Sequence, residues 1–410
     1  MLLSVCLIAR NEEQFLAGCL SSVRAVADEI IVVDTGSVDR TLEIARDHGC
    51  RVLQRDWDDD FSAARNAGIS VARGRWILCI DADERLSAST PPLSDLLEAT
   101  EPEVGGFFIE RHDVVTHAES GQTDVHAIGI LRLFRNHPEI RYEGIVHERP
   151  NETVLRAGFQ IRGLTSLKLT HLVSHLPQER LEAKQRSYLR LLDLEIVRDS
   201  RNFWARYYRA KTLWFLRRTD EAREEFEGIV EAGDCPSPLK ASTWCMLAAL
   251  LSEEGFRGAA VDCVQESLEL IPGQSLAYYV LAEVLYADGR YAHALEAYRR
   301  VRISMDPERV ASHVLGDLCL TREKRAYKMG CCALALGELM EAEDLFREGL
   351  ESRPDHAGCH YGLARAALLR GHQAEAVELL EAAVSADPGW REVRELLARL
   401  RADGALGGGR

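Results

Sequence analysis

The sequence predicts two parts, an α/β domain over residues 1–175 and an all-helical solenoid over residues 203–400. In the first part, short apolar strands alternate with amphipathic helices, which is typical of a mostly parallel sheet with ligands at the carboxyl ends of its strands. In the second part, a helical pattern repeats every 34 residues. A connecting helix is expected over residues 176–202 and a flexible tail over residues 401–410.

The α/β part begins with four apolar strands, each followed by polar residues. These strands are expected at residues 2–9, 29–33, 51–54 and 75–80. Apolar residues at helical spacing predict helices over residues 12–26 and 61–72, and another helix that starts at Asp39. Two later apolar segments, residues 106–110 and 129–134, are expected to form antiparallel strands at the edges of the sheet.

The helical part carries small residues and prolines at a fixed spacing. Gly337 and Gly371 stand 34 residues apart, and so do Pro354 and Pro388. Small residues where two helices cross, with a proline after the second helix, are typical of the tetratricopeptide pattern. Because one helix pair cannot bury its apolar face alone, such pairs stack into a solenoid with a concave surface. Five units are expected, starting near residues 203, 241, 275, 323 and 357, with an insertion at residues 308–322.

The composition indicates an ordinary globular protein. Of the 410 residues, 46% are apolar and 28% are charged, and the formal net charge is −15. This acidic balance argues against nucleic-acid binding, which needs a basic patch. The eleven cysteines include no C-x-x-C pair, which favours reduced thiols and a cytoplasmic location. No apolar run is long enough for a transmembrane segment, and the charges that begin at Arg10 argue against a signal peptide.

Polar residues follow all four strands, and in a parallel sheet these strand ends should meet at one edge. The polar clusters are residues 9–12, 34–39, 56–60 and 81–83. The last cluster is an Asp-x-Asp, which can hold a divalent cation that bridges a substrate diphosphate. Each cluster alone could be a solvated turn or a helix cap, but the four together fit a nucleotide. The Gly-rich fingerprints of dinucleotide-binding proteins and of NTPases are absent from the sequence.

Several of these segments resemble family-2 glycosyltransferases, which have the GT-A (Rossmann-like) fold. The motifs are SVCLIARNEE at residues 4–13, VDTGSVDRT at 33–41, ARNAG at 64–68 and DADE at 81–84. The segments RLFRN at residues 132–136 and YEGIVHE at residues 142–148 are similar to a narrower group, the lipopolysaccharide-core glucosyltransferases and the bacteriocin S-glycosyltransferases. Several members of that group also carry C-terminal tetratricopeptide helices. The resemblance implies a metal-dependent, inverting transfer of a hexose from a nucleotide-sugar, with a UDP-sugar as the expected donor.

The resemblance also implies roles for single residues. Asp34 would pair with the uracil edge, Glu12 would lie on the ribose side, and Arg65 would lie near the base or the diphosphate. Asp81 would contact the ribose or the water shell of a metal, and Asp83 would ligate Mn²⁺ or Mg²⁺ directly. The full set expected around the donor is Ala9, Asn11, Glu12, Asp34, Arg65, Asp81 and Ala82.

The general base that an inverting transfer needs is less clearly marked, because the family's usual Glu-Asp motif is not obvious in this sequence. Glu148 is the predicted base, and His147 is expected to be a metal ligand or a donor to the diphosphate. Both residues could instead cap the next segment. Asp113 is an alternative base. His171 is a second candidate for the metal, although a single histidine on an apolar segment is often structural.

The acceptor remains open. A tetratricopeptide groove commonly holds an extended peptide, so a peptide or protein acceptor is expected, with a lipid or glycan acceptor as the alternative. Two further alternatives are a nucleotidyltransferase and an interaction scaffold whose N-terminal domain is degenerate. No nucleic-acid partner is expected, and the edges of the repeats leave self-association into a homo-oligomer open.

Overall fold

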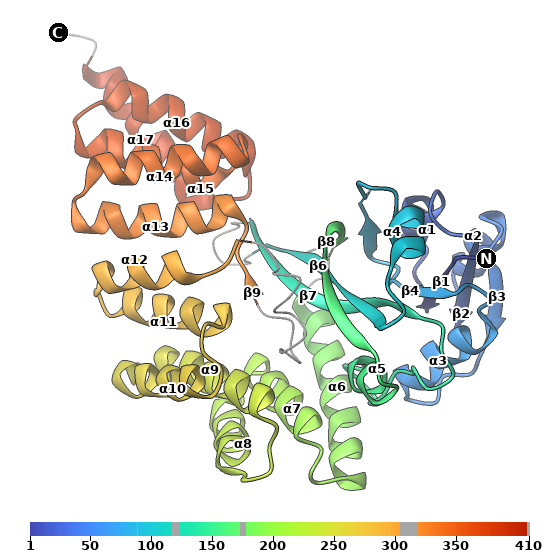
Figure 1. Cartoon of the computed structure of the whole chain (residues 1–410). Coiled ribbons are helices and arrows are strands. Elements are labelled where there is room, and N and C mark those ends of the chain that lie inside the picture. Colours follow the sequence, from blue (N-terminus) through green and yellow to red (C-terminus); the bar gives the residue numbers. More distant parts are fainter. Residues whose placement is uncertain (88, 117–122, 173–177, 304–317, 408–410) are drawn as a thin grey trace. The chain divides into compact units, whose positions relative to one another are not determined.

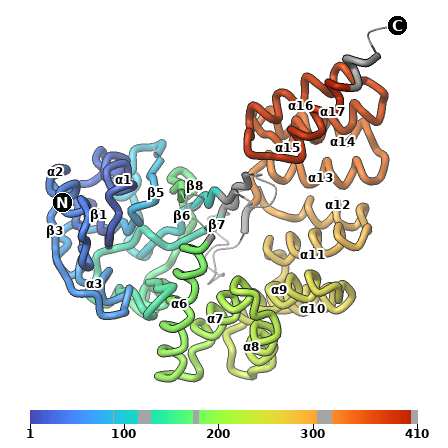
Figure 2. Tube along the Cα trace, turned by 180° about the vertical axis from the view of Figure 1, so that it is seen from behind, coloured from blue at the N-terminus to red at the C-terminus, as the bar shows by residue number. Residues whose placement is uncertain are grey.

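The computed structural model describes residues 1–87, 89–116, 123–172, 178–303 and 318–407 (Figures 1 and 2). The chain divides into two compact units. The first consists of Met1–Asp113 and Ile128–Leu250, and the second of Val114–Ala127, Leu251–Ser304 and Leu318–Arg410, apart from the residues outside the description.

A mixed sheet forms the centre of the first unit, and its strands follow the order β3-β2-β1-β4-β7-β6-β8-β5 (Figure 1). The strands are β1 (Leu3–Ala9), β2 (Glu29–Asp34), β3 (Arg51–Gln54), β4 (Trp76–Cys79), β5 (Glu84–Leu86), β6 (Val104–Thr116), β7 (Thr123–Arg135) and β8 (Gln160–His171). β1 runs parallel to β2 and β4, and β2 runs parallel to β3. The carboxyl ends of the first four strands therefore share one edge, as the sequence predicts.

The prediction of edge strands is wrong. β7 is antiparallel to β4, as expected, but it lies inside the sheet between β4 and β6. β6 is inside the sheet too, because β8 pairs with it on the other side. The sequence interpretation missed both β5 and β8. β8 runs parallel to β6 and antiparallel to β5, which sets His171 beside Asp113 on one strand and Glu84 on the other.

Five helices accompany this sheet. They are α1 (Leu16–Val23), α2 (Thr41–Asp47), α3 (Phe61–Val71), α4 (Leu93–Ala99) and α5 (Asn151–Arg156). α1 is shorter than predicted because a turn precedes it, in which the N–H groups of Phe15 and Leu16 both donate to the Glu12 carbonyl. α3 begins where expected, and the Asp60 carboxylate caps it by accepting from the N–H of Ala63 at 2.8 Å. Gly68 allows α3 to lie close to the sheet, since a Cβ there would be 3.0 Å from a Val33 methyl.

A long helix, α6 (Gln178–Arg198), and then five helix pairs follow the sheet (Figure 2). The pairs are α7 (Phe203–Phe215) with α8 (Thr219–Glu231), α9 (Ser237–Glu253) with α10 (Arg257–Leu270), α11 (Ser275–Ala287) with α12 (Tyr291–Arg300), α13 (Arg322–Leu336) with α14 (Leu339–Ser352), and α15 (Ala357–Leu369) with α16 (Gln373–Ala386). Each pair begins at or near its predicted start, and the largest difference is Ser237 against residue 241.

The recurring glycine has a structural reason. Gly255, Gly289, Gly337 and Gly371 lie at the turns between paired helices, and all have positive φ, which glycine adopts without steric cost. The last helix, α17 (Arg391–Gly407), includes most of the predicted tail. Most of the predicted insertion, and residues 408–410, lie outside the described residues; within them, β9 (Leu318–Cys319) is a short strand. In the described part of the chain, no helix has both the length and the apolar character needed to cross a membrane.

Candidate active site at the carboxyl edge of the sheet

Hydrogen bonds tie the end of β1 to the loop after β2. Asn11 has a left-handed backbone, with φ of 57°. Its side-chain oxygen accepts from the N–H of Val38 at 2.9 Å, and its own N–H donates to the Ser37 hydroxyl at 3.0 Å. The N–H of Glu12 donates to the Thr41 hydroxyl at 2.7 Å. These contacts hold two of the predicted donor-binding clusters side by side.

Asp34 stabilises the same loop from inside. It is 1% exposed, and its carboxylate accepts from the N–H groups of Gly36 and Ser37 at 3.2 Å. Ala9 pairs with Asp34 across the parallel strands, and its carbonyl accepts from the N–H of Thr35 at 3.0 Å. The structure thus gives Asp34 a loop-shaping contact, and its contact with a uracil edge stays a prediction.

The Asp81 carboxylate lies between two buried arginines. One oxygen accepts from Arg65 at 2.7 Å and the other from Arg132 at 2.6 Å. Arg65 also donates through Nε to Glu148 at 2.5 Å. Burial would raise the pKa of Asp81, but the charges of Arg132 and Arg65 outweigh it and lower the pKa of this carboxyl well below its usual range. Asp81 is therefore charged at physiological pH, with both oxygens engaged.

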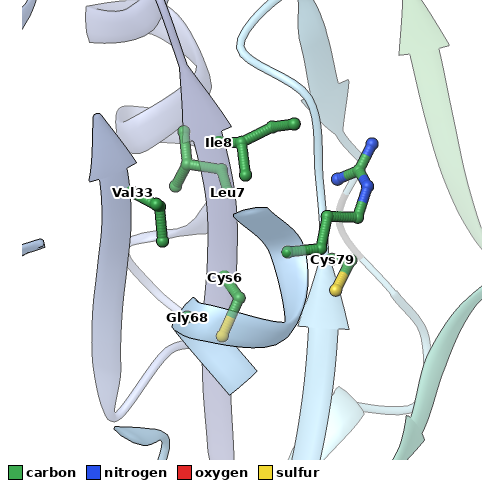
Figure 3. Close-up of a pocket in the computed structure, with 7 residues that line it drawn as sticks. Cys6, Leu7, Ile8, Val33, Gly68 and Cys79 are labelled. Carbon is green, nitrogen blue, oxygen red and sulfur yellow. The ribbon is translucent and has the colours of Figure 1, made fainter. Parts of the chain in front are cut away.

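Beneath this cluster, the sheet and α3 enclose a narrow recess, most of whose lining is labelled in Figure 3. It is lined by Cys6, Leu7, Ile8, Val33, Arg65, Gly68 and Cys79. Cys6 and Cys79 are register partners on β1 and β4. Because the recess has no room for a water molecule, it is a packing seam around Arg65 and not a ligand site.

The second aspartate of the motif faces a histidine. Nε2 of His171 lies 3.3 Å from an Asp83 carboxylate oxygen, and Nδ1 lies 2.8 Å from an Asp113 oxygen. Arg111 donates to the other Asp113 oxygen at 3.0 Å. Burial alone would lower the pKa of His171, but its hydrogen bonds to Asp113 and Asp83 raise it to about 9. Without a metal, the protonated ring therefore bridges two carboxylates.

Asp83 and His171 are ligand types that divalent cations accept, and Asp113 lies behind the histidine. A metal-ligating histidine usually donates its second ring N–H to a carboxylate, which is the relation between His171 and Asp113. Mg²⁺ typically takes one or two carboxylates together with substrate phosphates. Within the described ranges, no group of three or more His, Cys, Asp and Glu side chains converges as a metal site. Asp83 and His171 would therefore need phosphate and water oxygens to complete a coordination shell.

His147 and Glu148 face different neighbours. Glu148 is paired with Arg65, as described above. The His147 ring stacks on Tyr208 of α7, with the centroids 4.1 Å apart, and lies 5.3 Å edge-on to Tyr188 of α6. Burial and the nearby charge of Lys211 lower the pKa of His147 to about 3, so the ring is neutral at physiological pH. The structure gives His147 a packing contact, and its catalytic role stays a prediction.

The remaining predicted residues lie near this edge. Glu12 is partly buried, and burial together with the charge of Asp83 raises the pKa of its carboxyl to about 7. Ala82 is 4% exposed, and its carbonyl accepts from Arg85 at 3.1 Å. Because the pKa of its carboxyl lies near neutrality, Glu12 is the residue of this group whose charge is most easily changed when a ligand binds.

Sequence reasoning assigned no role to Arg132, Lys184 and Tyr188. An arginine within the apolar strand β7 is a signal that it has a buried partner, which proves to be Asp81. Lys184 and Tyr188 are one turn apart on α6, but the sequence does not show which face of this helix packs on the domain. The charge of Lys184 acts on Asp83 and Asp81.

Comparison with known proteins agrees with this architecture. Residues 4–146 match the model "Glycosyl transferase family 2", and residues 245–308 and 333–400 match tetratricopeptide repeat models.

Three curated proteins are similar over parts of the chain. A TPR repeat-containing protein of Synechococcus elongatus is 44% identical over 154 residues, which are 37% of this chain and 36% of that protein. The SPbeta prophage-derived glycosyltransferase SunS of Bacillus subtilis is 26% identical over 219 residues, 53% of this chain and 50% of SunS. An uncharacterized glycosyltransferase of Rickettsia typhi is 38% identical over 85 residues, 21% of this chain and 29% of that protein. The chain thus spans half or less of each of these relatives. Residues 4–146 are similar to family 2 glycosyltransferases, in agreement with the predicted GT-A fold, and residues 245–308 and 333–400 are similar to tetratricopeptide repeats.

Proposed function

We propose that the chain is a metal-dependent, inverting glycosyltransferase that moves a hexose from a UDP-sugar to an acceptor. The observation that carries the proposal is the array of Asp83, His171 and Asp113 at the carboxyl edge of the sheet. The family 2 domain supports sugar transfer in general. The metal, the uridine nucleotide and the acceptor are steps beyond that family assignment.

Asp83 and His171 would hold Mn²⁺ or Mg²⁺, which when bound would neutralise the diphosphate and favour its departure. Asp113 would keep the His171 ring oriented with Nε2 toward the metal. His171 has to lose its proton before it can act as a ligand, so metal binding should release a proton. Asp34 and Glu12 would accept hydrogen bonds from the base and the ribose, at the end of two neighbouring strands.

Glu148 would take the proton of the acceptor. Because Arg65 holds one oxygen of this carboxylate, the other oxygen is the one that would receive the proton. Arg65 thereby links the proposed base to Asp81, and through it to the metal side of the site. The repeats support a peptide or protein acceptor, since tetratricopeptide solenoids form concave binding surfaces.

The test is donor turnover by the full chain with a panel of UDP- and GDP-sugars, with Mn²⁺ and after chelation. We expect release of UDP from at least one donor, and a higher melting temperature with UDP and Mn²⁺. Asp83→Asn should lower turnover roughly a hundredfold, in line with loss of a key charge-stabilising group. Asp47→Asn, an exposed residue on α2, is the matched control and should be unchanged. Absence of both turnover and a thermal shift in the unmodified chain would instead favour the interaction scaffold.

A further inference from the structure

The helix α6 lies outside the segment that matches the family 2 domain, yet it packs firmly on it. Ile145 and Val146 share an apolar cluster with Leu191 and Leu192 of α6. The N–H of Ile145 donates to Glu195 at 3.0 Å. This packing fixes α6 against the segment that carries His147 and Glu148.

Aromatic and ionic contacts extend the same interface. Tyr188 of α6 lies 6.0 Å edge-on to Phe61 of α3 and 5.3 Å from His147, measured between ring centroids. Arg190 of α6 pairs with Asp59 at 2.8 Å. Apolar, aromatic and ionic contacts therefore all hold the face of α6 that carries Tyr188 toward the edge of the sheet.

Lys184 lies one helical turn before Tyr188 on this face. Its ammonium lies 5.7 Å from the centre of the Tyr188 ring. The side chain is exposed. Its charge nevertheless acts on Asp81 and Asp83 after β4, and on Glu12 after β1. An exposed cation whose charge acts on acids from two strand ends lies within electrostatic reach of the carboxyl edge.

Three other cations near these acids already have carboxylate partners. Arg65 and Arg132 hold Asp81, and Arg111 holds Asp113. Among the residues that the structure describes, Lys184 makes no ion pair with a carboxylate within 4.0 Å. It is therefore a cation near these acids that is available to a ligand. A lysine ammonium on a flexible stem is also well suited to a phosphate oxygen, which it meets as a point charge.

We propose that Lys184 of α6 binds the diphosphate of the nucleotide-sugar and stabilises it as the leaving group, from a position outside the family 2 domain. This inference rests on the proposed function. It gives the diphosphate a second positive partner besides the proposed metal. Charge develops on the diphosphate as the glycosidic bond breaks, and a cation placed there in advance stabilises the transition state. Tyr188 would keep the ammonium in place through the ring contact.

The test compares ligands that differ only in their phosphates. Binding of uridine, UMP and UDP is measured by calorimetry for the full chain and its Lys184→Met and Lys184→Arg variants. Lys184→Met should weaken UDP binding roughly ten- to a hundredfold, the range for a charge-assisted hydrogen bond, and leave uridine binding unchanged. Lys184→Arg should recover most of the UDP affinity, since it restores the charge. Turnover of the donor should fall in Lys184→Met by at least the same factor.

Lys211→Met is the matched control. Lys211 is also an exposed lysine beside a tyrosine ring, 5.8 Å from Tyr208, but its charge acts on His147, and within the described residues it has no interaction with Asp81, Asp83 or Glu12. This variant should bind UDP like the unmodified chain. Equal UDP affinity in Lys184→Met and the unmodified chain would overturn the assignment, and so would an equal loss for uridine and UDP. Failure of the unmodified chain to bind UDP at all would instead refute the proposed function and this inference with it.

Discussion

Replacement of Asp81 by asparagine removes the charge between two buried arginines and keeps the size of the side chain. In the native site its oxygens lie 2.7 Å from Arg65 and 2.6 Å from Arg132. Each arginine would keep one other acid, Glu148 at 2.5 Å for Arg65 and Glu84 at 3.7 Å for Arg132. The substitution therefore leaves two positive charges close together with only part of their compensation.

Removal of one partner from a buried ion pair typically costs about 3–5 kcal/mol. Because other acids remain and the Asp81 side chain is 27% exposed, we expect the lower end of this range for Asp81→Asn. A loss of about 3 kcal/mol corresponds to a roughly 150-fold increase in the opening equilibrium of the local structure. Asp83→Asn is the control, because Asp83 is similarly exposed, at 30%, and its ion pair with His171 is longer, at 3.3 Å. Its expected cost is under about 1 kcal/mol.

Hydrogen exchange measures this difference locally, which is necessary because a chain with two compact units need not unfold in a single step. Amides of β4 and β7, which flank the cluster, should lose protection in Asp81→Asn and keep most of it in Asp83→Asn. Equal protection of these strands in the two variants would show that the arginine pair does not depend on Asp81.

Three further predictions concern single residues. Burial raises the pKa of the Glu12 carboxyl to about 7, so Glu12 becomes able to accept a hydrogen bond from ribose as the pH rises through 7, and uridine binding without metal should strengthen several-fold. Calorimetry of Glu12→Gln should give a uridine affinity that does not change with pH, and the same pH-independence in the unmodified chain would contradict this role. His147→Ala should destabilise the contact with α7 by about 1 kcal/mol or more through loss of the stack on Tyr208. Because burial lowers the pKa of His147 to about 3, this histidine contributes stability that is complete above its ordinary pKa and is lost as the pH falls toward 3. Hydrogen exchange in α7 that is equally acid-sensitive in the unmodified chain and in His147→Ala would contradict this contribution. Gly337→Ala should lower the local stability of α13 and α14 by about 1 kcal/mol, measured by hydrogen exchange, since φ at this position is 79°. Gly337→Asn should lower it less, and an alanine variant with unchanged exchange would refute the backbone argument.

The strand ends and the repeats could be predicted because their signals are local. Apolar runs followed by polar residues identify the ends of β1 to β4, and a glycine recurs at four of the five turns within the helix pairs. Such patterns depend only on neighbouring residues, so tertiary packing changes where a strand or helix begins and ends but not whether it forms.

The contacts within the site could not be predicted, since they depend on which distant segments pair. Asp81 and Arg132 are 51 residues apart, and Asp83 and His171 are 88 residues apart. Their meeting requires β7 to lie beside β4 and β8 to lie beside β5. The direction in which α6 turns Lys184 depends likewise on its packing against Ile145 and Val146.

The packing of α6 and α7 on the sheet unit also decides where the chain can be divided for expression. A protein cut after residue 146 would leave Ile145 and Val146 exposed to solvent, and one cut after residue 175 would also expose the stacked face of His147; such apolar patches promote aggregation. A cut after α8 would retain the partners of all three. The first helical pair is thus part of the interior of the sheet unit as well as of the repeat array. A soluble fragment with the donor site intact should therefore end near residue 231 and not at residue 146, where the family 2 match ends.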